Sequence, residues 1–149
     1  NARYVFGRTE FEHWRDHGKS PDHIAVFTDS VKPIADADKA DLVPSDHRLT
    51  DEITLIPTPG HSPGHMSIHI RSDGEEGLLT GDVAHHPCQM AHLDWSSTAD
   101  SDPRQSVVTR RELFSRFADT PTLLIGGHFN AGHIKREGQA FKFIALDAP

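Results

Sequence analysis

The chain has 149 residues, of which 36% are apolar and 25% charged, and this composition is typical of one globular domain. Its formal net charge is −7 with histidine counted as neutral, which disfavours nucleic acid as a partner because polyanion binding needs clustered Lys and Arg. The basic pairs Arg110-Arg111 and Lys135-Arg136 are expected to lie on the solvated surface.

Membrane and export signals are not visible. No apolar run reaches the roughly 20 residues that span a bilayer, and no charged, apolar and small-residue leader is present. We therefore expect no membrane partner and a cytoplasmic location. The single cysteine, Cys88, excludes an internal disulfide. The chain begins at Asn1 rather than at a methionine, so we expect residues to precede it.

The N-terminal third shows weak patterns. Residues 1–7 are predicted to form a short strand, because residues 2–6 have a β-rich composition. Thr9, followed by acidic residues, indicates the N-cap of a helix that ends near Gly18. A second helix with a long connection is predicted over residues 35–42, between two prolines.

The middle of the chain is β-rich. Strands are predicted at residues 52–58, 66–70 and 78–80, from alternating or continuous apolar residues between turn signals. In the second of these strands His69 is expected to point outward. The loop over residues 83–101 is long for a compact domain, which is typical of a loop that serves a site.

The C-terminal part predicts one long helix and three strands. Asp102 is the expected N-cap and Pro103 the first helical residue, and the helix ends before Pro121. The strands are predicted at residues 123–125, 132–136 and 139–144, the last two forming a hairpin. Strands outnumber helices, so we expect an α+β fold with helices on one face of the sheet.

Histidine is the one unusual feature of the composition, with 12 residues in the chain. Three apolar strands end in the same way, with a glycine followed by His61, Asp82 or His128. Glycine lets the backbone turn sharply there, and a carboxylate can hold two metal ions about 3.5–4 Å apart. We therefore predict these three residues as metal ligands, the alternative being residues that only cap turns.

Three further histidines lie near these turns. His65 follows His61 but already begins the next strand, so His61 is the better-placed ligand. His85 and His86 come soon after Asp82, near enough to line the same cleft. We expect His65, His85 and His86 to contact the substrate or to support the ligands from behind.

Other hydrolytic chemistries have less support in the sequence. There is no Gly-x-Ser-x-Gly motif of a serine hydrolase and no glycine-rich phosphate loop. Cys88 with a nearby histidine could form a nucleophilic pair, but Pro87 and Met90 indicate a packed loop.

Three motifs, in this order, resemble the second half of a metallo-β-lactamase-fold hydrolase. They are Thr58-Pro59-Gly60-His61-Ser62-Pro63-Gly64-His65, Leu79-Thr80-Gly81-Asp82 and Gly126-Gly127-His128-Phe129. Residues 1–6 and 85–95 are similar to the lactonase-like and esterase-like branch. The resemblance implies an αββα sandwich, of which residues 1–149, as a single domain, form mainly the C-terminal half.

The resemblance also implies roles for the three ligands. His61 completes the first metal site, His128 binds the second metal, and Asp82 bridges both metals as the catalytic carboxylate. It implies two zinc ions, with Mn, Fe or Co as alternatives, and a bridging hydroxide that attacks an ester, lactone or related carbonyl of a small molecule.

One departure from the family is serious. Its His-x-His-x-Asp-His motif, which supplies most of the ligands, is absent from the chain. Three ligands are too few for two metals, so we expect a C-terminal fragment of a longer hydrolase, inactive or weakly active by itself. Two alternatives stay open. One is a half-domain that acts as an assembly or binding module, as a homo-oligomer such as a dimer or by pairing with an N-terminal half. The other is a redox relative, such as a persulfide dioxygenase or a flavodiiron protein.

Overall fold

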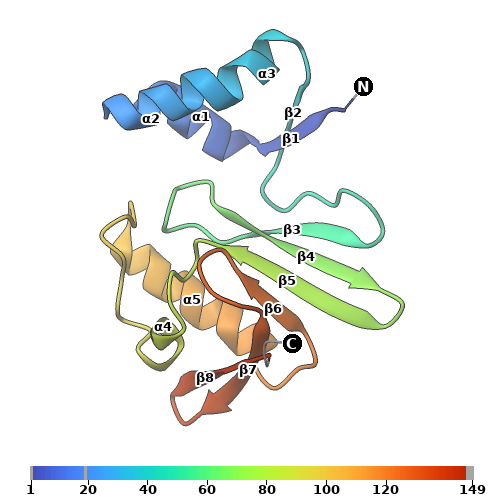
Figure 1. Cartoon of the computed structure of the whole chain (residues 1–149), viewed down its shortest axis with the longest axis vertical. Coiled ribbons are helices and arrows are strands. Elements are labelled where there is room, and N and C mark those ends of the chain that lie inside the picture. The colour runs from blue at the N-terminus through green and yellow to red at the C-terminus, as the bar shows by residue number, and fades with distance from the viewer. Residues whose placement is uncertain (1, 19, 147–149) are drawn as a thin grey trace.

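The N-terminal part of the protein is a helical segment attached to a two-stranded sheet. The computed structural model describes residues 2–18 and 20–146, so Asn1 of the predicted first strand lies outside the described residues. The elements of this part are β1 (Tyr4–Gly7), α1 (Arg8–His17), α2 (Pro21–Val26), η1 (Phe27–Val31), α3 (Lys32–Asp36) and β2 (Ala40–Val43). In Figure 1 they lie together above the main sheet.

The helix predicted over residues 35–42 is wrong. The helical run ends at Asp36, and Asp38 takes a positive φ of 55°. The chain then forms β2, which pairs in parallel with β1. The predicted N-cap at Thr9 is also wrong, because β1 runs directly into α1 and Gly7 occupies the N-cap position with extended backbone. The partner of β2 lies far away in the sequence, so local patterns do not reveal this strand.

The main sheet has six strands. They are β3 (Ile53–Pro57), β4 (Met66–Ser72), β5 (Glu75–Gly81), β6 (Leu123–Gly126), β7 (Gly132–Glu137) and β8 (Ala140–Ala145). Their order in the sheet follows the sequence, with β5 and β6 parallel and every other pair antiparallel. The strands predicted in the middle and C-terminal parts, including the final hairpin, are confirmed.

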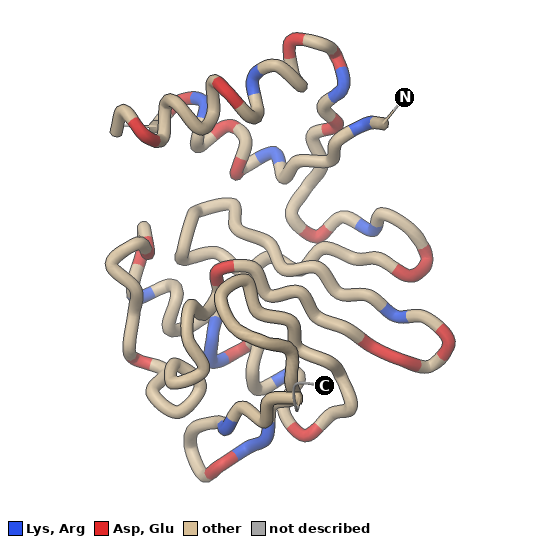
Figure 2. The backbone as a smooth tube through the Cα atoms, in the orientation of Figure 1, with Lys and Arg blue, Asp and Glu red and all other residues tan. Residues whose placement is uncertain are grey.

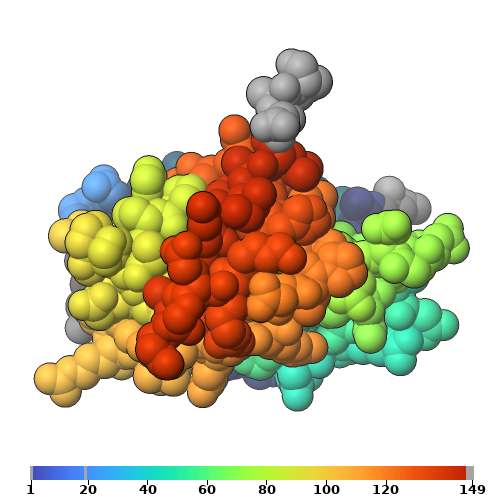
Figure 3. Space-filling model, turned by 90° about the horizontal axis from the view of Figure 1, so that it is seen from below, coloured from blue at the N-terminus to red at the C-terminus, as the bar shows by residue number. Residues whose placement is uncertain are grey.

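The crossover between β5 and β6 carries α4 (Cys88–Ala91) and α5 (Pro103–Phe117). The short helix α4 lies inside the segment predicted as a loop. Asp102 caps α5 as predicted, because its Oδ1 accepts hydrogen bonds from two backbone N–H groups of the first turn. In Figure 3 the β7–β8 hairpin (red) crosses the face seen from below, beside the segment that carries α4 (yellow-green).

The hydrophobic core lies between α5 and one face of the main sheet. Phe114 and Phe117 of α5 pack in one buried cluster with Leu78, Leu124 and Phe141 from three strands. These contacts follow from the alternation of the strands, which places every second side chain beneath the helix. The α+β class predicted from the sequence is confirmed.

Two polar residues that were predicted at the surface are buried. His69 shares the face of β4 that α5 covers, its ring lies 5.2 Å from that of Phe117, and its Nε2 is 3.2 Å from Glu76 Oε2. Arg110 is fully buried on the inner side of α5, whereas Arg111 is exposed as predicted. The prediction for His69 failed because alternation along a strand does not show which face α5 covers. The prediction for Arg110 failed because a basic pair in a helix does not show which of its members faces the core.

Figure 2 shows the Lys and Arg positions scattered among the Asp and Glu positions. Within residues 2–18 and 20–146, no helix has the length and apolarity required to cross a membrane.

Candidate metal centre

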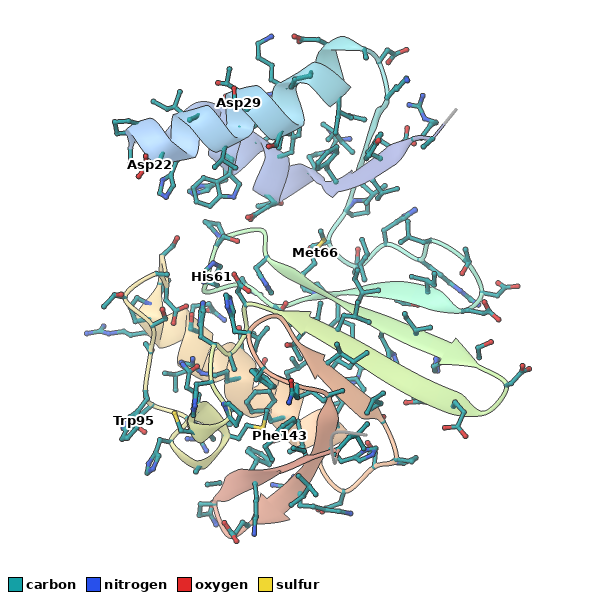
Figure 4. All side chains as sticks on the ribbon, viewed as in Figure 1. Asp22, Asp29, His61, Met66, Trp95 and Phe143 are labelled. Carbon is teal, nitrogen blue, oxygen red and sulfur yellow. The ribbon has the colours of Figure 1, made fainter. Side chains whose placement is uncertain are left out.

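The three strand-end turns predicted to carry metal ligands meet in space, with Asp82 between the two histidines. The Oδ2 atom of Asp82 lies 3.4 Å from Nε2 of His61, and its Oδ1 atom lies 3.1 Å from Nε2 of His128. Each carboxylate oxygen therefore faces a different imidazole. All three side chains are partly accessible to solvent. Figure 4 shows His61 at the end of the main sheet nearest the N-terminal helices.

The turn that presents His61 depends on glycine. Gly60 has a φ of 137°, and a Cβ atom there would lie 2.5 Å from the backbone nitrogen of Ser106 in α5. Thr109, also in α5, donates a hydrogen bond from its hydroxyl to the carbonyl oxygen of Pro59 at 2.5 Å. The turn is thus pressed onto α5, which determines where the imidazole of His61 lies.

The turn that presents Asp82 is held by His65. The backbone N–H of Asp82 donates to Nε2 of His65 at 3.0 Å, while Nδ1 of His65 lies 3.1 Å from the carbonyl oxygen of Thr58. Burial, with a smaller contribution from His61, lowers the pKa of His65, so this imidazole is neutral. Because Nε2 accepts a hydrogen bond, Nδ1 carries the proton and donates a hydrogen bond to Thr58, whose carbonyl oxygen and Oγ1 both lie within reach. Both nitrogens of His65 are used inside the protein.

His85 lies against the same cluster. Its ring is 4.9 Å from that of His128 and 5.1 Å from that of His61, measured between centroids. Its Nδ1 atom is buried without a hydrogen-bond partner among the described residues. Burial lowers the pKa of His85, so the ring is neutral near pH 7. A neutral imidazole with an unused nitrogen suits a metal or a polar group of a ligand.

Gln89 holds the segment that carries His85, although no sequence motif marks this residue. Its Oε1 atom accepts hydrogen bonds from the backbone N–H groups of His85 at 2.7 Å and His86 at 3.2 Å. Its side-chain amide donates to the carbonyl oxygen of Trp95 at 2.8 Å. Pro87, which directly precedes α4, is the local sequence feature that indicates a helical turn at this place.

His86 does not join the cluster. Its side chain is exposed, and its Nδ1 atom accepts a hydrogen bond from the backbone N–H of Cys88 at 3.1 Å. A further residue that sequence reasoning missed does join it. Asp100 places its Oδ1 atom 3.3 Å from Nδ1 of His61. Nothing in the pattern around Asp100 distinguishes it from the other acidic residues of the same loop.

Two groups of three side chains have donor atoms within 4.8 Å of one another. The groups are Asp82, His85 and His128, and His61, His85 and Asp100. Imidazole nitrogen and carboxylate oxygen suit zinc, manganese, iron or cobalt, and the unpartnered Nδ1 of His85 is consistent with a bound group. The donors fit a divalent metal, but they are too few to give two ions four protein ligands each.

Comparisons with solved structures show the same fold. The hydrolase AbOPH of the beta lactamase superfamily superimposes with a TM-score of 0.88 at 21% identity, over 100% of this chain and 56% of that one. The dizinc quorum-quenching lactonase AidC gives 0.81 at 20% identity, over 97% and 55%. A probable metal-dependent hydrolase from Staphylococcus aureus gives 0.71 at 18% identity, over 100% and 54%.

The chain therefore spans about half the length of these proteins. A comparison with curated protein sequences finds no match. A family model, in contrast, matches residues 2–128, which include all three glycine-flanked turns. With the shared fold and the convergence of these turns, this match establishes that the chain belongs to the metallo-beta-lactamase superfamily.

Proposed function

We propose that the protein is part of a metal-dependent hydrolase that acts on a small-molecule ester or lactone. His61, Asp82 and His128 are the proposed ligands, with Asp82 as the central catalytic carboxylate. The observation that carries this proposal is the division of the Asp82 carboxylate, whose two oxygens face two different histidines. That arrangement suits a carboxylate shared between two ions, for which zinc is our first choice.

A bound divalent metal lowers the pKa of water and polarises a carbonyl group, so the protein itself needs no nucleophile. The residues of the chain then have to place the metal and orient the substrate. His65 keeps the Asp82 turn in position through the backbone N–H. His85 presents a neutral ring beside His61 and His128, and we propose that it contacts an oxygen of the ester or lactone. For His86 the exposed position supports no such role.

A lactone is the preferred substrate class for one further reason. AidC, which shares the fold, is a dizinc quorum-quenching lactonase with N-hexnoyl-L-homoserine as its bound product. A sequence identity of 20% supports a shared fold but not a shared substrate, so the choice of a lactone is part of the proposal.

The shortage of ligands leads to a second proposal, about assembly. The main sheet has a partly exposed apolar face opposite α5, where Ile68, Leu79 and Ile125 lie side by side in register on β4, β5 and β6. We propose that an N-terminal half carrying the remaining ligands packs on this face. A second copy of the chain is the alternative occupant. Sedimentation of a strict monomer, with and without zinc, would exclude the second copy.

Zinc titration of the purified chain tests the proposed ligands. We expect weak binding that is reduced at least about tenfold in Asp82→Asn, since the central donor loses its charge. His86→Ala is the matched control, because this histidine is exposed and outside the donor groups, and it should bind zinc like the unmodified chain. Equal affinity in Asp82→Asn and His86→Ala would contradict the assignment.

Hydrolysis by the zinc-loaded chain tests the claim that it carries only part of the site. With a chromogenic ester and an N-acyl homoserine lactone as substrates, we expect rates close to those of free zinc. Substantial turnover that depends on Asp82 would show that the chain needs no further ligands. It would leave the metal assignment intact.

A further inference from the structure

Behind His61 lies a buried pair of opposite charges, Asp100 and Arg110. Their side chains are 1% and 0% exposed, and Arg110 Nη1 lies 4.0 Å from Asp100 Oδ2. The same Oδ2 atom accepts a hydrogen bond from the backbone N–H of Ser97 at 3.2 Å. The other oxygen, Oδ1, lies 3.3 Å from Nδ1 of His61. One buried carboxylate therefore connects a cation inside α5 to the predicted ligand.

Backbone hydrogen bonds fix the position of this carboxylate relative to the His61 turn. The N–H of Ser101 donates to the carbonyl oxygen of His61, and the N–H of Asp102 donates to that of Gly60, both at 2.9 Å. The residues immediately after Asp100 are thus tied to the glycine turn itself. These bonds hold the backbone next to Asp100 beside the His61 turn.

The two nitrogens of His61 have different surroundings. Nε2 lies 3.4 Å from Asp82 Oδ2 in the open cleft, and Nδ1 faces Asp100. A neutral imidazole carries one proton, and the nitrogen next to a buried carboxylate is where that proton forms a charge-assisted hydrogen bond. We propose that Asp100 is a positioning residue for His61, holding the proton on Nδ1 and leaving the Nε2 lone pair available to a metal on the side where Asp82 lies.

Arg110 makes the burial of Asp100 tolerable. A buried carboxylate without a counter-charge is strongly destabilising, and Arg110 is the cation close to it. Arg110 Nη2 donates to Ser96 Oγ at 3.2 Å, but Nε and Nη1 have no hydrogen-bond partner among the described residues. Arg110 therefore acts on Asp100 mainly through its charge. This role explains why a basic residue occupies the inner side of α5.

Direct ligation of a metal by Asp100 is the competing role, since its oxygen, His61 and His85 lie within 4.8 Å of one another. Three observations favour positioning. The carboxylate is almost fully buried, one of its oxygens already accepts a backbone hydrogen bond, and the guanidinium of Arg110 lies beside it. A positive charge at this distance disfavours a second cation on the same carboxylate.

The tautomer of His61 in the metal-free chain is the first test, and it is measured on the unmodified chain. We expect ¹⁵N NMR, at a pH where the imidazole of His61 carries a single proton, to show that proton on Nδ1. The signal is assigned by its loss in His61→Gln. A proton on Nε2 would overturn the proposal.

Asp100→Asn is the second test, with Asp94→Asn as a matched control from the same loop, because Asp94 is exposed. This test rests on the proposed function. In Asp100→Asn we expect the zinc affinity to fall about 10- to 100-fold and the preference of the His61 proton for Nδ1 to be lost. In Asp94→Asn we expect both the zinc affinity and the tautomer to stay unchanged. If Asp100→Asn had the same zinc affinity and the same His61 tautomer as Asp94→Asn, the positioning role would be overturned. It would also be overturned if the cobalt(II) absorption spectrum of Asp100→Asn showed that the metal had lost one oxygen ligand. If the unmodified chain binds no zinc, the proposed function fails, and the tautomer still decides the role of Asp100.

Discussion

His65 accepts a hydrogen bond at its Nε2 atom from the backbone N–H of Asp82, at 3.0 Å. Two histidines of one turn therefore have different roles. His61, at the tip, directs a nitrogen toward the Asp82 carboxylate, whereas His65, directly before β4, holds the backbone of Asp82 in place. The second role needs a neutral ring, and burial provides it by lowering the pKa of His65.

The first prediction concerns this hydrogen bond. His65→Ala leaves the partly buried N–H of Asp82 without its partner, so we expect the free energy of unfolding to fall by about 1–2 kcal/mol. Urea denaturation followed by circular dichroism measures the loss. His86→Ala, which removes an exposed histidine, should change stability by less than about 0.5 kcal/mol. Equal stability of the two variants would show that the bond does not hold the turn.

The second prediction separates the two reasons for glycine at position 60. Gly60→Ala adds a Cβ atom 2.5 Å from Ser106 N at a φ of 137°, whereas Gly74 has a φ of 82° with no atom within 4 Å of a Cβ. We expect Gly74→Ala to cost about 1–2 kcal/mol from backbone strain alone, and Gly60→Ala to cost more because α5 must also move. Thermal unfolding of both variants provides the comparison. Similar costs would mean that the turn does not press on α5.

The turns of the site were predictable from the sequence because their geometry is local. An apolar run, a glycine and a polar residue describe the strand ends at His61 and Asp82 without reference to the rest of the chain. The hairpin of β7 and β8 was found for the same reason. Each of these features is determined by neighbouring residues.

Features that depend on distant contacts could not be predicted. β2 exists because it pairs with β1, and the residues of β2 do not show that partner. Asp100 and Arg110 were overlooked because their importance comes from burial between the 83–101 segment and α5. An acidic residue in a loop and a basic pair in a helix are ordinarily solvated, and only the packing shows otherwise.

The third prediction concerns pH and the pairing of β1 with β2. Arg3 forms two hydrogen bonds to the carboxylate of Asp41, at 2.8 and 2.7 Å. The hydrogen bond and charge of Arg3 hold the pKa of Asp41 below its ordinary value. At pH values above the ordinary pKa of an aspartate, the pair should therefore stabilise the pairing of β2 with β1. This contribution should disappear as the pH falls through the lowered pKa of Asp41. NMR titration should show the pKa of Asp41 rising in Arg3→Gln, and an unchanged pKa would contradict the pairing.

The fourth prediction concerns the segment that carries His85. Gln89→Leu removes the acceptor of two backbone N–H groups and the donor to Trp95, so we expect a loss of about 1–3 kcal/mol in stability. Amide hydrogen exchange should accelerate at His85 and His86, because both N–H groups become unpartnered. The hairpin of β7 and β8 serves as the internal reference. Exchange that increases equally there would indicate general destabilisation rather than loss of a local support.

The last prediction concerns the buried charges of Arg110 and Asp100. Arg110→Met leaves the buried carboxylate without a counter-charge, and breaking a buried pair in this way costs about 3–5 kcal/mol. Adding Asp100→Asn to Arg110→Met removes the stranded charge, so the double variant should be more stable than Arg110→Met alone. Arg111→Met is the control, because its side chain is exposed one position along α5, and it should unfold like the unmodified chain. Urea denaturation of the unmodified chain, of Arg110→Met, of Asp100→Asn and of the double variant gives the coupling free energy. If the two changes simply add, the charges do not interact, and another group must compensate the carboxylate behind His61.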